Sequence, residues 1–192
     1  KEAYEKVEIY DGLGWLDMAG YGSYSKIEGF AFLPITCFTM ALTTYISQNL
    51  GAKEYQRAKV GAKFGILSSV LMAEIIGVLL YFSAPVLIGL FSKDPDVIRY
   101  GVQQVHIVAL FYFLLSYSHC IAAVCRGAGK AVVPMVIMLV VWCGIRILYI
   151  TTIMSIIHYI QFIYLAYPIT WGISSIIYLI YYKRSDWIHG YE

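Results

Sequence analysis

Four ionisable residues lie within or beside long apolar stretches of this 192-residue sequence: Glu28, Glu74, His106 and Arg146. A charged side chain at the centre of a bilayer costs on the order of 2.5–3.5 kcal/mol even on insertion-based scales. Such side chains are therefore expected to face protein or water rather than lipid. Each is a candidate for a path that carries protons, ions or cationic substrates, and the alternative for each is a structural bond between helices.

The same residue types form no recognisable catalytic or metal-binding pattern. His106 and His119 are thirteen residues apart, which is about 20 Å along a helix and too far to share one metal ion. The stretch from Arg126 to Lys130 resembles a phosphate-binding loop. However, Val124 stands where that loop requires its first glycine, and Ala131 stands where it requires Ser or Thr. The sequence therefore predicts no enzyme and favours a helix–helix turn at this stretch.

The composition indicates that lipid surrounds most of the chain. Hydrophobic residues make up 60% of it and charged residues 14%, with a mean hydropathy of +0.69. Soluble domains are about 45–50% apolar and about 25% charged. Basic residues do not alternate with aromatic ones as they do on a nucleic-acid-binding face. We therefore expect an all-α polytopic transmembrane bundle whose partner is the lipid bilayer and not a nucleic acid.

Five apolar runs have the length of membrane spans, since a helix needs about 20 residues to cross about 30 Å of hydrocarbon. They predict helices at about residues 27–48, 60–82, 97–124, 132–154 and 156–182, with a tight turn near Ser155 to Tyr159. Residues 1–26 are predicted to form an external stub after a missing helix. Residues 183–192 are predicted to form a cytoplasmic tail.

Basic residues lie in alternate connections between these spans. The links after the first and third spans and the C-terminal tail hold Lys53, Arg57, Lys59, Arg126, Lys130, Lys183 and Arg184. The link over 84–96 has mixed charge. Because cytoplasmic loops carry an excess of Lys and Arg, we predict a multi-pass protein of the cell membrane with its C-terminus in the cytoplasm. This orientation requires a further span before Lys1.

Depth along each span relates the candidate residues to one another. Glu74 and Arg146 each lie fourteen residues from the inner start of their predicted spans, which is about 21 Å. His106 lies at about the same depth, whereas Glu28 lies at the outer rim. We therefore predict that Glu74 pairs with Arg146, or that Glu74 and His106 titrate in a proton-linked path.

Several segments occur in the order and at the spacing of one transporter family. They are Ser25 to Phe30 with Leu33-Pro34, Gln48 to Lys53, Leu90 to Val97, Cys125 to Lys130 with Pro134, and Trp142 to Arg146. Together they resemble the second half of a multidrug and toxic compound extrusion (MATE) transporter, from about Gly12 to Tyr182. The family-motif positions are Gln48, Asn49, Gly51, Ala52, Phe91, Asp94, Arg126, Gly127, Gly129 and Pro134.

The resemblance implies the second lobe of a two-lobe, pseudo-symmetric transporter, without the first helix of that lobe. It implies a partner in the missing N-terminal lobe of the same chain. It also implies export of cationic or amphipathic small molecules in exchange for entering Na⁺ or H⁺, with no other cofactor. Many members bind the coupling cation through an acidic residue on the missing helix and an Asp in the helix that here spans 97–124. Because this span has no Asp, coupling is expected to use the other lobe or other carboxylates.

Three alternatives stay open beside the exporter. A flippase for lipid-linked saccharides belongs to the same wider superfamily, although aromatic-rich helices with few cations favour a cationic amphipath over its diphosphate cargo. A membrane-embedded enzyme requires a nucleophile and a base at one depth, and the sequence has no recognisable pair. A structural membrane subunit does not explain the ionisable residues inside the spans.

Overall fold

The computed structural model describes residues 2–156 and 160–188, with side chains for 19–153, 155 and 162–188. Over these ranges the chain is helical without strands, and five segments are long and apolar enough to cross a membrane. They are Ala19–Gly51, Tyr55–Gly89, Pro95–Gly127, Val132–Ile153 and Phe162–Arg184. The predicted all-α polytopic fold is confirmed.

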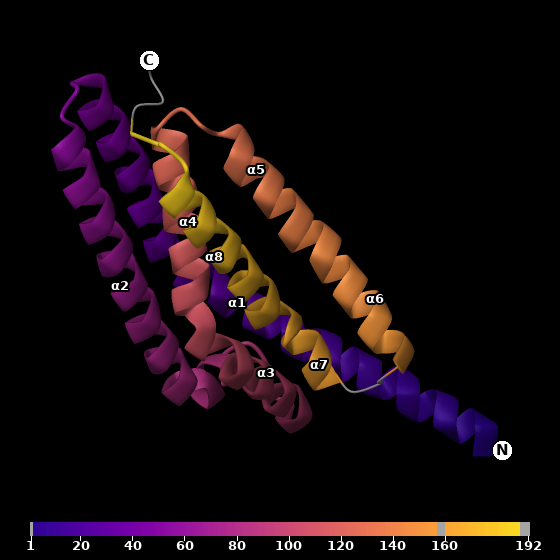
Figure 1. Ribbon diagram of the computed structural model, residues 1–192. Helices are drawn as coiled ribbons and strands as arrows, with labels where there is room; N and C mark the ends of the chain where they lie inside the picture. Colours follow the sequence, from indigo (N-terminus) through magenta and orange to yellow (C-terminus); the bar gives the residue numbers. More distant parts are fainter. Residues whose placement is uncertain (1, 157–159, 189–192) are drawn as a thin grey trace.

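The helical elements follow one another with short links (Figure 1). In chain order they are α1 (Glu2–Gly51), α2 (Tyr55–Gly89), α3 (Pro95–Val108), the 3₁₀-helix η1 (Ala109–Phe111), α4 (Tyr112–Gly127), α5 (Val132–Met138), the π-helix η2 (Leu139–Ile145), α6 (Arg146–Ile156), α7 (Ile160–Tyr164) and α8 (Ala166–Arg184). The third span thus consists of α3, η1 and α4 in succession, with α3 at an angle to α4 (Figure 1), and the fourth consists of α5, η2 and α6.

The first helix is longer than the span predicted over 27–48. It runs from Glu2, so residues 2–26 of the predicted stub are helical and continuous with the span. A search for uninterrupted apolar runs misses this part because polar residues such as Ser23 and Ser25 interrupt the run without ending the helix. The predicted turn near Ser155 to Tyr159 falls partly on residues 157–159, which lie outside the described residues.

The core of the bundle is formed by α1, α2 and α4, which pack side by side (Figure 1). The shorter α3 packs against α1 and α2 near the end that holds the α2–α3 link, and α8 lies against α4. The α5–η2–α6 segment lies along the outer side of α8 and contributes few buried residues. The α1–α2 link, the α4–α5 link and the C-terminus share one end of the bundle (Figure 1).

Small residues bring the helices into close contact, as expected for packing in lipid. Ala58 and Ala62 are fully buried between α1 and α2, and a Cβ added to Gly61 would overlap the Tyr45 ring. On α2, Gly77 lies directly against η1, where an added Cβ would overlap the carbonyl oxygen of Ala109. The backbone of α2 therefore touches the backbone of the third span at its 3₁₀ break.

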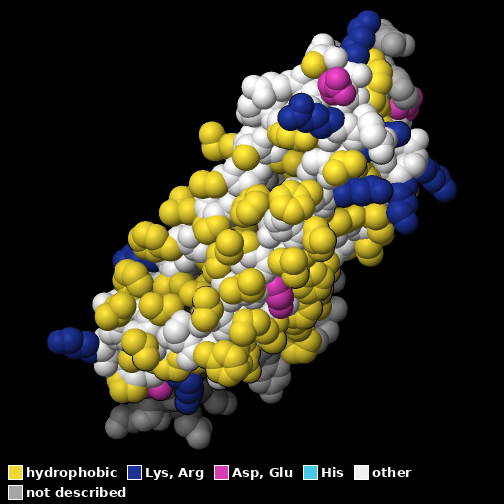
Figure 2. All heavy atoms as spheres, turned by 90° about the vertical axis from the view of Figure 1, so that its left-hand side faces the viewer, with side chains coloured by type: hydrophobic (Ala, Val, Ile, Leu, Met, Phe, Trp, Pro, Cys, Tyr) yellow, Lys and Arg dark blue, Asp and Glu magenta, His cyan; other side chains and the backbone are white. Residues whose placement is uncertain are grey.

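An apolar belt covers the face that α2 contributes, and Lys and Arg side chains lie at both ends of that face (Figure 2). The exposed large side chains of α2 include Val60, Phe64, Leu67, Leu71, Ile75, Leu79, Phe82 and Val86. A soluble protein rarely exposes an apolar surface of this extent. The belt is therefore consistent with a helix that faces lipid.

The segment after α8 folds back onto the end of the bundle. The Lys130 ammonium donates a hydrogen bond to the Asp186 carbonyl oxygen (2.6 Å). Trp187 stacks on Tyr182 with ring centroids 5.4 Å apart, and it is buried against side chains of α1, α2 and α4. Residues 185–188 of the predicted tail are therefore part of the packed structure.

Candidate functional site

One stripe along α1 carries the polar and aromatic side chains that face the centre of the bundle. Its members are Tyr21, Tyr24, Glu28, Phe32, Thr36, Thr39 and Thr43, spaced three or four residues apart. Residues at this spacing share one face of a helix. Their partners lie on α4, α6 and α8, so this stripe assembles the candidate site.

Near the N-terminal end of the stripe, a carboxyl group is held by tyrosines. The Tyr24 hydroxyl donates a hydrogen bond to the Glu28 carboxylate (2.9 Å). The same hydroxyl lies 3.5 Å from the Tyr112 hydroxyl of α4, and both tyrosine side chains are almost fully buried. Glu28 lies two residues after Lys26, whose ammonium lies over the Phe91 ring, so this carboxyl group is near the end of the bundle that holds the α2–α3 link.

The positive group of this site is Arg146, at the start of α6. Its guanidinium donates a hydrogen bond to the Thr170 hydroxyl (2.7 Å) and lies over the Tyr167 ring, 4.5 Å from the centroid. It also interacts electrostatically with the Glu28 carboxyl group. The Tyr167 hydroxyl in turn shares a 2.8 Å hydrogen bond with that of Tyr21. A carboxyl group and a guanidinium thus both contact a set of tyrosines that comes from three spans.

We call this set the Glu28 cluster: Tyr21, Tyr24, Glu28, Tyr112, Arg146, Tyr167 and Thr170. Buried polar atoms without hydrogen-bond partners lie in and beside it, namely Nε of Arg146 and the indole Nε1 atoms of Trp142 and Trp171. Buried polar groups are nearly always paired, and those that are not mark positions where water, an ion or a ligand is expected. The cluster therefore has unused hydrogen-bonding capacity next to its two charged groups.

The π-helix η2 immediately precedes Arg146 and carries Trp142. The Trp142 ring lies 5.4 Å from the guanidinium of Arg146 and contacts the ring of His119 edge-on at 5.2 Å. His119 makes a similar edge contact with Phe32 of α1 at 5.0 Å. Single π-turns inside α-helices occur often at functional sites. Here the π-turn lies where the fourth span meets the polar stripe.

A hollow lies at the other end of the stripe. Thr39, Met40, Thr43 and Thr44 of α1 line it together with Arg126 of α4, and its volume is about 340 Å³. The Thr43 hydroxyl also donates to the Ala123 carbonyl oxygen (3.2 Å), which joins the two helices. Polar side chains therefore continue along the stripe from the Glu28 cluster to the end that holds the basic links.

The structure does not form the predicted Glu74–Arg146 pair. One carboxylate oxygen of Glu74 is buried without a hydrogen-bond partner, and its carboxyl group interacts with the backbone of Phe113 beside η1. The His106 ring stacks on Tyr81 at 4.1 Å, and its Nε2–H donates to the Tyr81 carbonyl oxygen (3.1 Å). Glu74 and His106 thus each contact other groups, and Glu28 is the carboxyl group that interacts electrostatically with Arg146.

The family-motif positions lie at helix ends and close contacts. Asp94 caps α3 by accepting a hydrogen bond from the Asp96 N–H (2.9 Å), and Phe91 lies under the Lys26 ammonium. The backbone carbonyl oxygen of Asn49 accepts a hydrogen bond from the Glu54 N–H (2.8 Å) where α1 turns into α2. Gln48, Gly51 and Ala52 lie in the same turn.

The turn from α4 to α5 contains the remaining motif positions. Gly129 has φ of 74°, in the left-handed region that glycine adopts readily, as expected for a helix–helix turn. A Cβ on Gly127 would lie 2.7 Å from the Thr43 carbonyl oxygen, so the backbones of α4 and α1 meet there. Pro134 is buried, and its carbonyl oxygen accepts the Tyr178 hydroxyl (3.0 Å). Arg126 lines the hollow formed with Thr39 and Thr43 of α1.

Sequence reasoning missed the tyrosines and Thr170 of the Glu28 cluster. A usable signal was present on α1, because Tyr21 and Tyr24 precede Glu28 at helical spacing. No signal in the sequence indicated that Tyr167 and Thr170 of α8 would meet Arg146.

Comparison with known proteins identifies the family of this chain. The MatE family model matches residues 9–152, which is more than half of the chain. This chain belongs to the MatE family. The expected family is therefore confirmed. The match includes Glu28, Tyr112 and Arg146, and α8 with Tyr167 and Thr170 lies beyond it.

Curated relatives of this MatE chain are described as drug resistance proteins or transporters. It is 27% identical over 121 residues to the probable multidrug resistance protein NorM of Thermotoga maritima, covering 62% of this chain and 26% of NorM. It is 21% identical over 169 residues to the probable multidrug resistance protein YoeA of Bacillus subtilis, covering 86% of this chain and 36% of YoeA. A FAD transporter of Shewanella oneidensis is 29% identical over 83 residues, covering 43% of this chain and 18% of that protein. The chain thus spans about a third or less of the length of these relatives.

A solved structure has the same fold. The MATE transporter ClbM in complex with Rb⁺ superposes with a TM-score of 0.77 at 16% identity, covering 97% of this chain and 47% of ClbM. Together with the five membrane-length helices, the family match identifies a multi-pass membrane protein of a transporter family.

Proposed function

We propose that the protein containing this chain is a secondary active exporter of cationic or amphipathic compounds, coupled to entry of Na⁺ or H⁺, and not an enzyme. The observation that carries the proposal is the Glu28 cluster, in which a carboxylate and a guanidinium share a tyrosine-lined site within the spans. Ionisable groups placed inside a membrane protein typically mark ion or proton paths.

In this proposal Glu28 receives the coupling cation. Its carboxylate and the hydroxyl groups of Tyr24 and Tyr112 supply oxygen atoms, which are the ligands that hard cations prefer. A proton can bind the same carboxylate. When the cation leaves, the charge of Arg146 balances the negative charge that remains, which lowers the cost of a bare carboxylate in the membrane.

The cargo is proposed to bind against the exposed side of α1, toward the other lobe. That side carries Phe30, Leu33, Met40 and Thr44, a mixture of aromatic, apolar and hydroxyl groups. Such a mixture suits an amphipathic cation. Transport would proceed by rocking of the two lobes around the bound cargo, as in other repeat-built transporters. The basic links and the C-terminus are proposed to be cytoplasmic.

The experiment compares Glu28→Gln with wild type in the full-length protein, measuring folded yield and ion-driven efflux of a cationic dye together. Glutamine keeps the shape of the side chain and removes its charge. We expect wild-type yield with efflux reduced to the background of cells without the transporter. Glu54→Gln, in the exposed α1–α2 link, is the matched control and is expected to transport normally.

Efflux at the wild-type rate from the Glu28→Gln variant contradicts the proposal. A strongly reduced yield of that variant also contradicts the proposal, because it indicates that the Glu28 carboxylate serves stability by compensating the positive charge of Arg146.

A second candidate is export of an anionic compound. Arg146 stacked between aromatic rings favours it, because Arg and aromatic side chains together suit a planar anion. The FAD transporter among the relatives is named for such a cargo. Competition of dye efflux by FAD, but not by a cationic drug, would favour this candidate over the first.

A further inference from the structure

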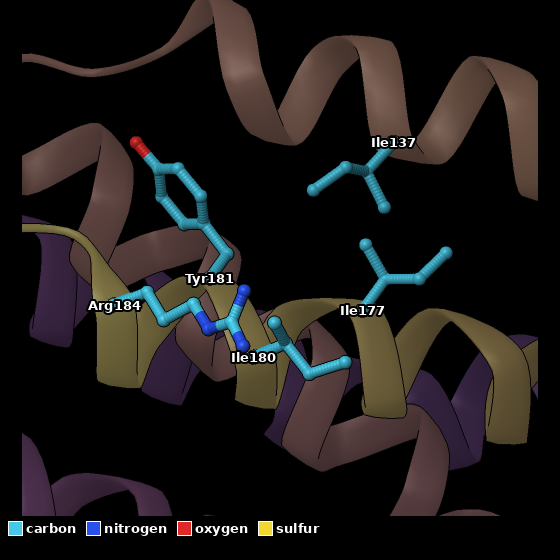
Figure 3. A pocket seen from close by; sticks show the side chains of 5 residues that line it. All are labelled: Ile137, Ile177, Ile180, Tyr181 and Arg184. Carbon is cyan, nitrogen blue, oxygen red and sulfur yellow. The ribbon is translucent and has the colours of Figure 1, made fainter.

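A groove between α5 and α8 opens at the end of the bundle that holds the C-terminus. It is lined by Ile137, Ile177, Ile180, Tyr181 and Arg184, and its volume is about 320 Å³ (Figure 3). Ile137 of α5 and Ile177 of α8 point toward each other across it (Figure 3). The lining is thus apolar at one end and ends in a guanidinium at the other.

The α8 side of the groove is a single helical stripe. Ile177, Ile180, Tyr181 and Arg184 stand at positions i, i+3, i+4 and i+7 and therefore lie along one face. Along this face the chemistry changes from aliphatic to phenolic to cationic toward the end of the helix. The same order, from hydrocarbon to hydrogen-bonding groups to charge, is found along a phospholipid from its acyl chain to its phosphate.

The α5 side is only loosely packed on the lobe. Among the residues of α5 and η2, Pro134 and Val141 are buried. The hydrogen bond from the Tyr178 hydroxyl to the Pro134 carbonyl oxygen joins α5 to α8 near the groove. In a bilayer, an apolar groove between loosely packed helices is open to lipid chains, because helices in lipid gain little from hydrophobic contact with each other.

Charge distinguishes this groove from the groove between α1 and α2, and its aliphatic lining distinguishes it from the hollow of threonines beside Arg126. The groove between α1 and α2 has a volume of about 490 Å³, and its lining is Phe38, Ala41, Leu42, Tyr45, Val60, Gly61, Phe64 and Gly65, without a cation. The α5–α8 groove is smaller but has Arg184 in its wall. Basic pockets between membrane helices on the cytoplasmic side bind anionic lipid head groups.

We propose that the α5–α8 groove binds one anionic phospholipid, with an acyl chain between Ile137 and Ile177 and the phosphate at the Arg184 guanidinium. Arginine suits this role because its planar guanidinium donates two parallel hydrogen bonds to the oxygen atoms of a phosphate. The lipid would fill the gap beside the fourth span and hold α5 against α8. The site is separate from the Glu28 cluster, so it does not depend on the proposed transport function.

The test uses native mass spectrometry of the full-length protein in detergent, titrated with phosphatidylglycerol or with phosphatidylcholine of the same acyl chains. We expect one phosphatidylglycerol to be retained in preference to phosphatidylcholine. Arg184→Gln is expected to weaken phosphatidylglycerol binding about fivefold, because the variant loses one contact between a basic residue and the anionic lipid. Lys183→Gln removes the same charge from the adjacent position outside the groove lining and is expected to have little effect.

A second pair of variants tests the acyl-chain end without changing charge. Ile180→Trp fills the groove and is expected to reduce binding of phosphatidylglycerol, whereas Ile176→Trp places the same side chain outside the lining. Equal retention of both lipids by the wild type, or absence of any bound lipid, overturns the proposal. Equal loss in Arg184→Gln and Lys183→Gln also overturns it, because it indicates general attraction to anionic lipid rather than this site.

Discussion

Replacement of Gly77 by alanine should destabilise the protein, although alanine is the better helix former. The structure places Gly77 in the middle of α2, against the 3₁₀ break of the third span. An added Cβ would overlap the Ala109 carbonyl oxygen and lie 3.2 Å from its carbonyl carbon. Both neighbours are backbone atoms, so no side chain can turn away to make room. The helices must separate locally instead.

The two opposing contributions can be compared. Alanine gains about 1 kcal/mol over glycine within a helix. Overpacking of a closely packed contact costs about 1–3 kcal/mol, and a clash between backbones belongs in the upper part of that range. The expected net effect is a loss of about 1–2 kcal/mol of stability.

Thermal unfolding of the full-length protein in detergent, followed by the amount that still elutes as a single species, measures this loss. Gly29→Ala is the matched control, because a Cβ at Gly29 of α1 has no neighbour within 4 Å. We expect a lower melting temperature for Gly77→Ala, and an unchanged or higher one for Gly29→Ala. If Gly77→Ala melts at or above the wild-type temperature, the contact between α2 and η1 is not as close as described.

Two further predictions concern the cluster and the orientation. Thr170→Val should lower the free energy of unfolding by about 1.5–3 kcal/mol, because it removes the hydroxyl that accepts a hydrogen bond from the Arg146 guanidinium. Thr170→Ser keeps the hydroxyl and should retain most of the stability. Equal melting temperatures of Thr170→Val and wild type would contradict this hydrogen bond. In a cysteine-free background, Arg57→Cys should react only with membrane-permeant thiol reagents and Lys93→Cys also with impermeant ones, and external labelling at position 57 would invert the proposed topology.

The spans could be predicted from the sequence because their length and apolarity follow directly from the thickness of the bilayer. Each predicted span overlaps one of the five helices that are long and apolar enough to cross a membrane. The start of the first helix could not be predicted in this way. Helix α1 continues without a break from residues 2–26 into the apolar run, because polar residues such as Ser23 and Ser25 end the run without ending the helix.

The partners of the charged residues could not be predicted from depth alone. Glu74 and Arg146 lie at the same predicted depth, but contact also requires that the two helices turn these residues toward each other. That rotation is fixed by packing, here by small residues such as Gly77, which bring α2 close to η1 rather than to α6. Helical spacing on α1 could have indicated the tyrosines near Glu28, whereas the contribution of α8 depends on tertiary contacts alone.

The π-helix η2 gives a physical reason for the place of Arg146. A π-turn contains one more residue than an α-turn, so it rotates all following residues about the helix axis relative to the preceding ones by about 100°. Because η2 ends at Ile145, Arg146 is the first residue to take the new direction, and it reaches Thr170 and Tyr167. A regular α-helix through this segment would point the guanidinium in a different direction about the helix axis. The irregular turn and the charge are therefore parts of one arrangement, in which a local change of helix geometry brings a cation into the Glu28 cluster.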